Sequence, residues 1–193
     1  HSSTGISAAM GYAVARDLRG GDEKVAVVIG DGSLTGGMAY EALNGLAQLK
    51  TGCVVVINDN NMSIGKNVGG LSKYLNEIRL GNAYNELKTG VESSLMGSKA
   101  GKKIARVLKR SKDNIKQFFV PGMFFEELGI TYVGPIDGHD INQMITTFQH
   151  AFRLDKPIII HVKTKKGKGY GHAERHPDYF HGIAPFDQLT GKV

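Results

Sequence analysis

Short apolar runs alternate with helical patterns along this chain. Three runs rich in Val and Ile, at residues 24–30, 53–57 and 157–162, are typical of strands buried on both faces of a parallel sheet. A shorter strand is predicted at residues 131–133. Apolar residues at helical spacing predict helices at about residues 6–18, 38–49, 123–128 and 141–154. This order indicates βαβ units, so we expect an α/β fold with a doubly wound, mostly parallel sheet flanked by helices.

Small and polar residues mark the ends of these elements. Ser2, Ser3 and Thr4 offer N-cap oxygens to the first helix, and Gly20–Gly21 can end it. Gly52 is expected to end the second helix. Glycine-rich or proline-containing turns are predicted at residues 30–37 and 135–139.

The middle and the end of the chain have weaker patterns. Residues 61–100 are rich in Asn, Gly, Ser and Lys, with a possible helix at 71–78, and a basic helix is expected at 101–118. We therefore expect one incomplete domain over residues 1–193, with a mobile basic insert at about 61–116 and a linker-like tail at about 164–193.

Composition and charge narrow the class of protein. The 193 residues suffice for one domain, and 26 glycines suggest tight turns or close backbone approach to a ligand. The net charge is +6, and residues 66–116 alone carry 12 Lys and Arg against 4 Asp and Glu. A nucleic-acid interface is not favoured, because no nucleic-acid motif and few aromatic residues accompany these charges.

The cysteine count and the apolar runs bear on location. The single cysteine, Cys53, excludes an intrachain disulfide framework and fits a reducing, cytoplasmic compartment. In its buried strand we expect it to be inert packing. The longest aliphatic runs are too short for a bilayer and no signal peptide is visible, so we expect no membrane partner. The chain begins at His1 without a Met, and we expect a fragment of a longer protein.

Two strand ends carry the candidate chemistry. The first predicted strand ends in Gly30-Asp31-Gly32 and the next in Asn58-Asp59-Asn60. Adjacent parallel strands place such ends side by side at one sheet edge. The Asp31 carboxylate, the Asn60 side-chain carbonyl and a backbone carbonyl such as that of Met62 are the hard oxygen ligands that Mg²⁺ or Ca²⁺ requires. Together with the glycines and the following helix N-terminus, they predict a metal–diphosphate site.

Other phosphate-binding motifs fit less well. Gly30, Gly32 and Gly36 are spaced one residue too widely for a dinucleotide-binding fingerprint, and no acidic residue follows near Gly52. No Gly-Lys-Ser/Thr follows the loop, so a P-loop is excluded, and a kinase glycine loop would lie between two strands. Each strand end alone could be a plain loop; their joint occurrence favours the metal–diphosphate site.

Gly-Asp-Gly, 25 residues and then Asn-Asp-Asn form the spacing of the thiamine diphosphate motif. With further segments, the chain resembles the 1-deoxy-D-xylulose-5-phosphate synthase family of transketolase-like enzymes over essentially all of its length. Those segments are His1-Ser2-Ser3-Thr4, Met62-Ser63-Ile64, Pro121-Gly122, Phe125 to Gly129, Gly134 to Asp140 and Thr164 to Tyr170.

The resemblance implies the diphosphate-binding domain of a thiamine diphosphate- and Mg²⁺-dependent transferase. The family condenses pyruvate with glyceraldehyde 3-phosphate, giving 1-deoxy-D-xylulose 5-phosphate and CO₂ for isoprenoid, thiamine and pyridoxal precursors, and its members are expected to be homodimers. The chain matches without the domain's first portion, the pyrimidine-binding domain or the C-terminal domain, so alone it should be inactive. A diphosphate-binding subunit of a split transketolase or 2-oxo acid dehydrogenase, or a non-catalytic binding module, is the alternative.

The resemblance also assigns site residues. Asp31, Asn60 and the Met62 carbonyl are the expected metal ligands, and His181 the expected active-site histidine. The expected cofactor contacts are His1, Ser2, Gly32, Ser33, Asn60, Lys166 and Tyr170. His139 is as compatible with a structural as with a functional role, and His161, inside an apolar strand, is expected to be a core histidine with its hydrogen bonds satisfied.

Overall fold

The computed structural model describes residues 2–62, 69–70, 73–75 and 122–193. Its elements are, in chain order, α1 (Gly5–Arg19), β1 (Ala26–Gly30), the 3₁₀ helix η1 (Asp31–Thr35), α2 (Gly37–Leu49), β2 (Cys53–Asp59), α6 (Met123–Glu127), β3 (Thr131–Asp137), α7 (Ile141–Ala151), β4 (Pro157–Lys163), α8 (Gly171–Arg175) and the 3₁₀ helix η3 (Tyr179–His181). None of the helices within these ranges has the length and hydropathy needed to cross a membrane.

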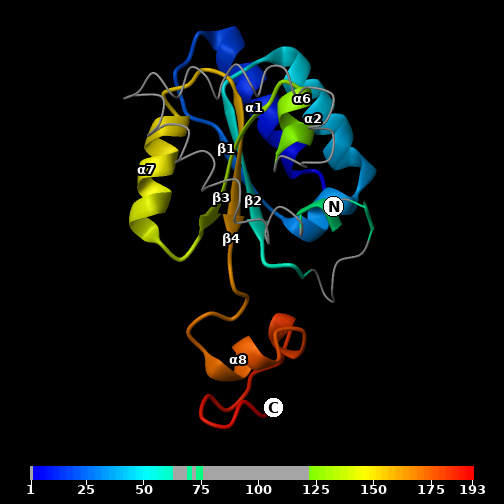
Figure 1. Ribbon diagram of the computed structural model, residues 1–193, viewed down its shortest axis with the longest axis vertical. Coiled ribbons are helices and arrows are strands. Elements are labelled where there is room, and N and C mark those ends of the chain that lie inside the picture. Colours follow the sequence, from blue (N-terminus) through cyan, green and yellow to red (C-terminus); the bar gives the residue numbers. More distant parts are fainter. Residues whose placement is uncertain (1, 63–68, 71–72, 76–121) are drawn as a thin grey trace, which may run out of the picture.

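The strands form one parallel sheet in the order β1-β2-β4-β3. Helices α1, α2 and α6 cover one face and α7 covers the other (Figure 1). The larger core cluster includes Leu43, Leu46 and Phe125 under the first face, while Ile158 and Ile160 pack toward α7 on the second. The expected α/β fold with a doubly wound parallel sheet is therefore confirmed.

Burial on both faces is confirmed for the two central strands and wrong for β1. All but one of the residues in β2 are buried, and likewise in β4. In β1, Ala26 is exposed and the Val28 side chain is 67% exposed. The reason is position: β1 is the edge strand of the sheet, and none of its residues belongs to the core cluster that packs with α7.

Two strands are longer than predicted. β2 extends beyond Ile57, so that Asn58 and Asp59 belong to the strand rather than to the loop after it. β3 runs through the residues expected as a turn, and only Gly138 and His139 turn the chain. A register irregularity in the β3–β4 pairing accommodates the longer β3.

Several helix ends also differ from the expectation. Thr4 is the N-cap of α1 but its side chain makes no capping bond, and Ser3 Oγ instead donates to the carbonyl of Ser33. Gly20 ends α1 in the left-handed conformation, as predicted. Lys50, not Gly52, is the C-cap of α2, and α7 ends at Ala151 rather than at Leu154.

The predicted turn after β1 is a 3₁₀ helix, η1, which continues into α2 after Gly36. The basic helix expected at 101–118 lies outside the described residues, as does most of the insert expected at 61–116. Residues 73–75 of the helix expected at 71–78 are described and are helical.

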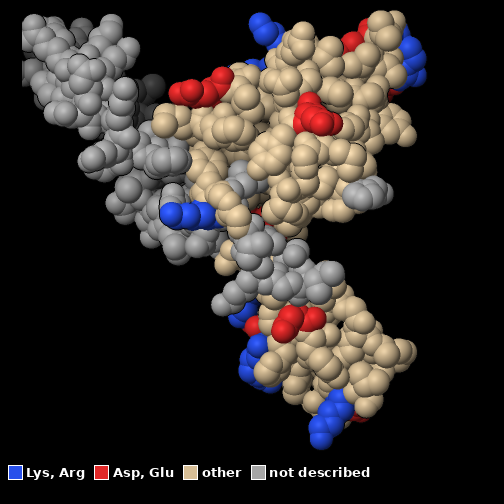
Figure 2. Space-filling model, turned by 90° about the vertical axis from the view of Figure 1, so that its right-hand side faces the viewer, with Lys and Arg blue, Asp and Glu red and all other residues tan. Residues whose placement is uncertain are grey.

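Residues 164–193, expected as a linker-like tail, form a lobe beyond the carboxyl end of β4, which we call the C-terminal lobe (Figures 1 and 2). It contains α8 and η3. The rings of Tyr170, Phe180 and Phe186 pack together with centroid distances of 5.2 to 5.8 Å. The carboxyl ends of the strands therefore face a folded segment rather than open solvent alone.

Candidate functional site

The ends of β1 and β2 meet as the sequence predicts. Gly30 pairs in register with Asn58, so the residues that follow both strands emerge together. They open onto a cavity of about 520 Å³, here called the strand-end cavity. Its lining residues are Ser2, Gly30, Asp31, Gly32, Ser33, Asn60, Met62, Lys166 and His181. Sites for small ligands commonly have volumes of about 300 to 1,000 Å³.

Asp31 is the buried carboxylate of this cavity. It is the first residue of η1 and only 4% exposed. Burial, followed by the charge and a hydrogen bond of the Asp59 side chain, raises the pKa of Asp31 to about 6, although the backbone N–H groups of Gly32 and Asp31 lower it. Two neighbouring carboxylates concentrate negative charge that a bound cation would compensate.

Asn60 and Met62 are held by two turns at the end of β2. The Asp59 Oδ1 atom accepts a hydrogen bond from the Asn61 N–H at 2.9 Å, and Asn60 Oδ1 accepts one from the Met62 N–H at 3.1 Å. Asn61 takes the left-handed conformation, with φ of 62°, that turns the chain here. The bond from Met62 fixes the Asn60 amide with a second lone pair of Oδ1 still available to a ligand.

Lys166 and His181 approach the cavity from the C-terminal lobe. The Lys166 Nζ atom lies 2.5 Å from His181 Nδ1. Because an ammonium group only donates, Nδ1 must be the acceptor, and the ring then carries its proton on Nε2. The arrangement adds a positive charge and an oriented imidazole to the cavity that Asp31 lines.

The structure brings together all but two of the residues predicted for the site. Ser2, Asp31, Gly32, Ser33, Asn60, Met62, Lys166 and His181 all line the cavity. Gly30, which the sequence analysis used only as part of the motif, lines it too.

Tyr170 does not line the cavity, and His1 lies outside the described residues. The Tyr170 hydroxyl donates to the Gln188 carbonyl at 2.9 Å, and its ring packs edge-on against Phe180, next to His181 in the chain. Its position is that of a support for the η3 segment, so the predicted cofactor contact of Tyr170 stays a prediction.

The donor set suits a hard cation shared with an anionic ligand. The described residues contain no cluster of three or more His, Cys, Asp and Glu side chains arranged for a metal. One carboxylate, one amide oxygen and one backbone carbonyl would leave coordination positions for ligand oxygens and water, as Mg²⁺ usually keeps. Lys166 adds a positive charge to the same cavity, which suits an anionic ligand.

The other histidines and Cys53 have structural surroundings. His161 is fully buried and hydrogen-bonded to Tyr132 and Asp59, so the expected core histidine is confirmed. His139 Nε2 accepts a hydrogen bond from the Lys165 N–H at 2.9 Å, which ties the β3–α7 turn to the start of the lobe. Cys53 is 1% exposed, and burial raises the pKa of its thiol to about 11, in keeping with inert packing.

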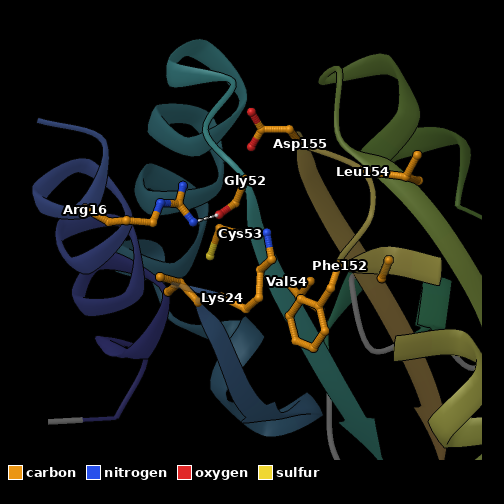
Figure 3. A pocket seen from close by; sticks show the side chains of 10 residues that line it. Arg16, Lys24, Gly52, Cys53, Val54, Phe152, Leu154 and Asp155 are labelled. Carbon is orange, nitrogen blue, oxygen red and sulfur yellow. Dashed lines mark hydrogen bonds between the residues drawn. The ribbon is translucent and has the colours of Figure 1, made fainter. Parts of the chain in front are cut away.

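A second cavity lies where α1 ends and β2 begins, and Arg16, Gly52, Cys53 and Asp155 are among its lining residues (Figure 3). Its volume is about 20 Å³, room for about one water molecule. This pocket is too small for a substrate, so the strand-end cavity is the candidate site.

Comparison with known proteins agrees with this geometry. The family model described as 1-deoxy-D-xylulose-5-phosphate synthase matches residues 1–164. The chain is 52% identical over 193 residues to the 1-deoxy-D-xylulose-5-phosphate synthase of Lachnoclostridium phytofermentans, and 54% identical over 194 aligned residues to that of Clostridium kluyveri. All of the chain is covered, but only 31% of each relative.

A solved structure has a related fold. The crystal structure of transketolase from Campylobacter jejuni superimposes with a TM-score of 0.54 over 92% of this chain and 22% of that one, at 22% sequence identity. At this identity, the likeness concerns the fold alone.

Proposed function

Because this chain belongs to the 1-deoxy-D-xylulose-5-phosphate synthase family, we propose that its strand-end cavity binds the diphosphate of thiamine diphosphate together with Mg²⁺. The chain spans about 31% of the length of the curated relatives it matches. We therefore infer the reaction for the longer protein that contains this segment: condensation of pyruvate with glyceraldehyde 3-phosphate to 1-deoxy-D-xylulose 5-phosphate and CO₂. The chain alone is expected to be inactive.

One observation carries this proposal. Asp31 and Asn60 come from neighbouring strands and line one cavity with Lys166 and His181, which belong to a segment more than 100 residues later in the sequence. Oxygen donors for a cation thus line the same cavity as a basic side chain that can bind phosphate oxygens. If the segments after β1 and β2 were ordinary loops without a ligand, there would be no need for these four side chains to line the same cavity.

The chain's own residues would bind and orient the cofactor. Asp31, Asn60 and the Met62 carbonyl would hold Mg²⁺. Backbone groups of Gly32 and Ser33, with Ser2 and Lys166, would contact the diphosphate, and His1 and Tyr170 remain proposed contacts. When bound, thiamine diphosphate supplies the electron sink that decarboxylation of pyruvate and formation of the new carbon–carbon bond require.

His181 would act at the reacting end of the site. Its Nδ1 atom accepts from Lys166, which leaves an Nε2–H group able to donate a hydrogen bond to substrate. The ring could pass that proton to substrate only while Nδ1 takes one from the Lys166 ammonium group. An imidazole is suited to proton transfer near neutral pH. We infer that His181 orients the substrate or transfers a proton, and that Lys166 fixes the tautomer in which it does so.

The proposed partners follow from the family. They are the two substrates, the remainder of the longer chain and a second subunit in a homodimer. The proposed location is the reducing cytoplasm, where the lone buried thiol of Cys53 is stable.

Calorimetric titration of this chain with thiamine diphosphate and Mg²⁺ tests the binding proposal. Asp31→Asn should lower the affinity at least about 10-fold, because it removes the charged metal ligand. Asp22→Asn, at an exposed position away from the cavity, is the matched control and should bind as the unaltered chain does. Equal affinity of Asp31→Asn and the control would contradict the metal site.

Activity is tested in the full-length protein. Asp31→Asn there should abolish Mg²⁺-dependent formation of 1-deoxy-D-xylulose 5-phosphate from pyruvate and glyceraldehyde 3-phosphate. Ketol transfer without use of pyruvate would instead identify a transketolase-type enzyme.

A further inference from the structure

Four polar side chains cross the sheet in a continuous buried row. They come from the four strands in their spatial order: Asp31 at the end of β1, Asp59 in β2, His161 in β4 and Tyr132 in β3. Each of them is at most 4% exposed. We call these residues the buried polar row. It lies on the sheet face covered by α1, α2 and α6, among the apolar residues of the larger core cluster.

The hydrogen bonds give the row a direction. Tyr132 Oη lies 2.6 Å from His161 Nδ1, and His161 Nε2 lies 2.9 Å from Asp59 Oδ2. With a neutral imidazole, the tyrosine hydroxyl donates to Nδ1 and the Nε2–H group donates to the carboxylate, so every polar atom of the ring has a partner. The bond at Nδ1 therefore fixes the ring, and the bond at Nε2 orients Asp59.

Asp59 links this row to the proposed cation ligands. One of its oxygens bonds His161, and the other accepts from the Asn61 N–H and so fixes the turn that carries Asn60. The same side chain contacts Asp31. One carboxylate thus constrains the residues on either side of the site, from β1 and from β2.

The backbone of His161 lies close to Gly134, and its ring packs edge-on against Tyr132, with centroids 6.0 Å apart. A Cβ atom on Gly134 would lie 2.5 Å from the His161 carbonyl oxygen and 3.1 Å from the His161 Cβ atom. The Tyr132 ring stacks on Phe125, with centroids 5.8 Å apart and planes 2° from parallel. These ring contacts and the hydrogen bonds to both imidazole nitrogens limit how far the imidazole and the phenol can reorient.

We propose that Tyr132, His161 and Asp59 are positioning residues for the divalent-cation site, holding Asp31 and Asn60 in the orientation in which they ligate. This inference rests on the proposed function. A buried ionised carboxylate is costly, and apolar side chains would serve a merely structural purpose at these positions at least as well. Partners that orient metal ligands in this way commonly contribute 10- to 100-fold to metal affinity.

The test measures Mn²⁺ affinity by electron paramagnetic resonance with thiamine diphosphate present, using the full-length protein that contains this segment. His161→Leu removes the donor to Asp59 and should weaken Mn²⁺ binding about 10- to 100-fold. His161→Gln can still donate from its side-chain amide and should restore most of that loss. Tyr132→Phe keeps the ring stacked on Phe125 and removes only the hydroxyl, and a loss of roughly 3- to 10-fold is expected.

The matched control is Tyr74→Phe. The Tyr74 hydroxyl accepts a hydrogen bond from the Phe124 N–H at 3.2 Å, away from Asp59. Its loss should shift the melting temperature and leave Mn²⁺ affinity unchanged. Melting is measured for every variant, so that an effect on folding is separated from one on the site. If His161→Leu does not fold, the Mn²⁺ affinities of Tyr132→Phe and Tyr74→Phe are compared instead. A loss in Tyr132→Phe alone supports the positioning role.

The outcomes separate the two proposals. Unaltered affinity in folded Tyr132→Phe and His161→Leu, while the unaltered chain binds Mn²⁺, overturns the positioning role and leaves the cation site intact. Equal losses in His161→Gln and His161→Leu also overturn it, because the hydrogen bond would then not matter. No Mn²⁺ binding by the unaltered full-length protein with thiamine diphosphate contradicts the cation site itself and this inference with it.

Discussion

The Arg16 side chain donates a hydrogen bond from Nη1 to the carbonyl oxygen of Gly52, 2.9 Å away, and so joins the end of α1 to the start of β2 (Figure 3). The same Nη1 group donates to the Glu23 carbonyl, and Nη2 donates to Thr51 Oγ1. Arg16 is 6% exposed, and its bond to Thr51 is buried while those to Glu23 and Gly52 are partly buried.

Arg16→Met should therefore destabilise the chain by about 3 kcal/mol, because one buried and two partly buried acceptors lose their donor while the packing of the side-chain stem is largely kept. Urea unfolding measures this loss. The control is Arg19→Met, which removes an exposed i,i+4 ion pair with Glu23 and should cost less than about 1 kcal/mol. Equal losses in the two variants would show that Arg16 does not act as a buried clamp.

Acid should weaken this part of the fold through Asp17. Hydrogen bonds from Thr51 and then from Arg16 hold the pKa of Asp17 below its ordinary value of 3.8. The folded state therefore favours the ionised form, and this contribution to stability is present above the unfolded pKa of 3.8. It is lost as the pH falls through the lower, folded pKa. Asp17→Asn should show a shallower loss of stability in urea unfolding below pH 4 than the unaltered chain; identical slopes would contradict this linkage.

Gly134 and Gly11 should respond in opposite directions to alanine. A Cβ on Gly134 would lie 2.5 Å from a backbone oxygen, at a φ of 128° that side chains rarely adopt, so Gly134→Ala should cost about 3 kcal/mol or more. Gly11 lies within α1 with nothing within 4 Å of an added Cβ. Gly11→Ala should stabilise the chain by about 0.5 to 1 kcal/mol. Thermal unfolding measures both variants, and the same sign of change would argue against this account.

The Cys53 thiol should react slowly in the folded chain. With the pKa raised to about 11, little thiolate exists at pH 8, and the residue is 1% exposed. Modification by an aromatic disulfide reagent should be slower by about 100-fold or more than in urea-unfolded chain. Comparable modification rates in the folded and unfolded chain would show that the first residues of β2 unfold locally and often.

Lys166 and Lys165 are neighbours with different expected roles. Lys166 lines the strand-end cavity, whereas Lys165 forms an ion pair with Glu174 inside the C-terminal lobe. Lys166→Met should lower the affinity for thiamine diphosphate about 10-fold, since one charge-assisted contact is lost. Lys165→Met is the control and should leave that affinity within about 2-fold. Calorimetry measures the affinity of both variants for thiamine diphosphate. A larger loss in Lys165→Met than in Lys166→Met would contradict the assignment of the diphosphate contact to Lys166.

Local patterns in the sequence were sufficient to predict the site's central geometry. A strand–helix–strand order implies two adjacent parallel strands, and the chain does place the ends that carry Asp31 and Asn60 together. No pattern near Lys166 or His181 in the sequence predicts that they line the same cavity as Asp31 and Asn60. That prediction came from the resemblance to a family, because the path of the chain after β4 depends on tertiary packing.

Long-range pairing explains what could not be predicted. The exposure of Val28 depends on how far α7 reaches across the sheet, which no run of residues near β1 encodes. Likewise, a histidine in an apolar strand indicates a satisfied core residue but not its partners. Asp59 and His161 are 102 residues apart and meet because β4 lies beside β2.

The strand order also determines when the site can form. β4 is the last strand in the sequence, yet it lies between β2 and β3 in the sheet. A growing chain cannot join β3 to the sheet by this pairing until residues 157–163 have emerged, and contacts so distant in sequence close slowly. During synthesis, the β1–β2 edge can therefore assemble well before His161 reaches Asp59, and ligand-binding competence is expected to be a late event in folding.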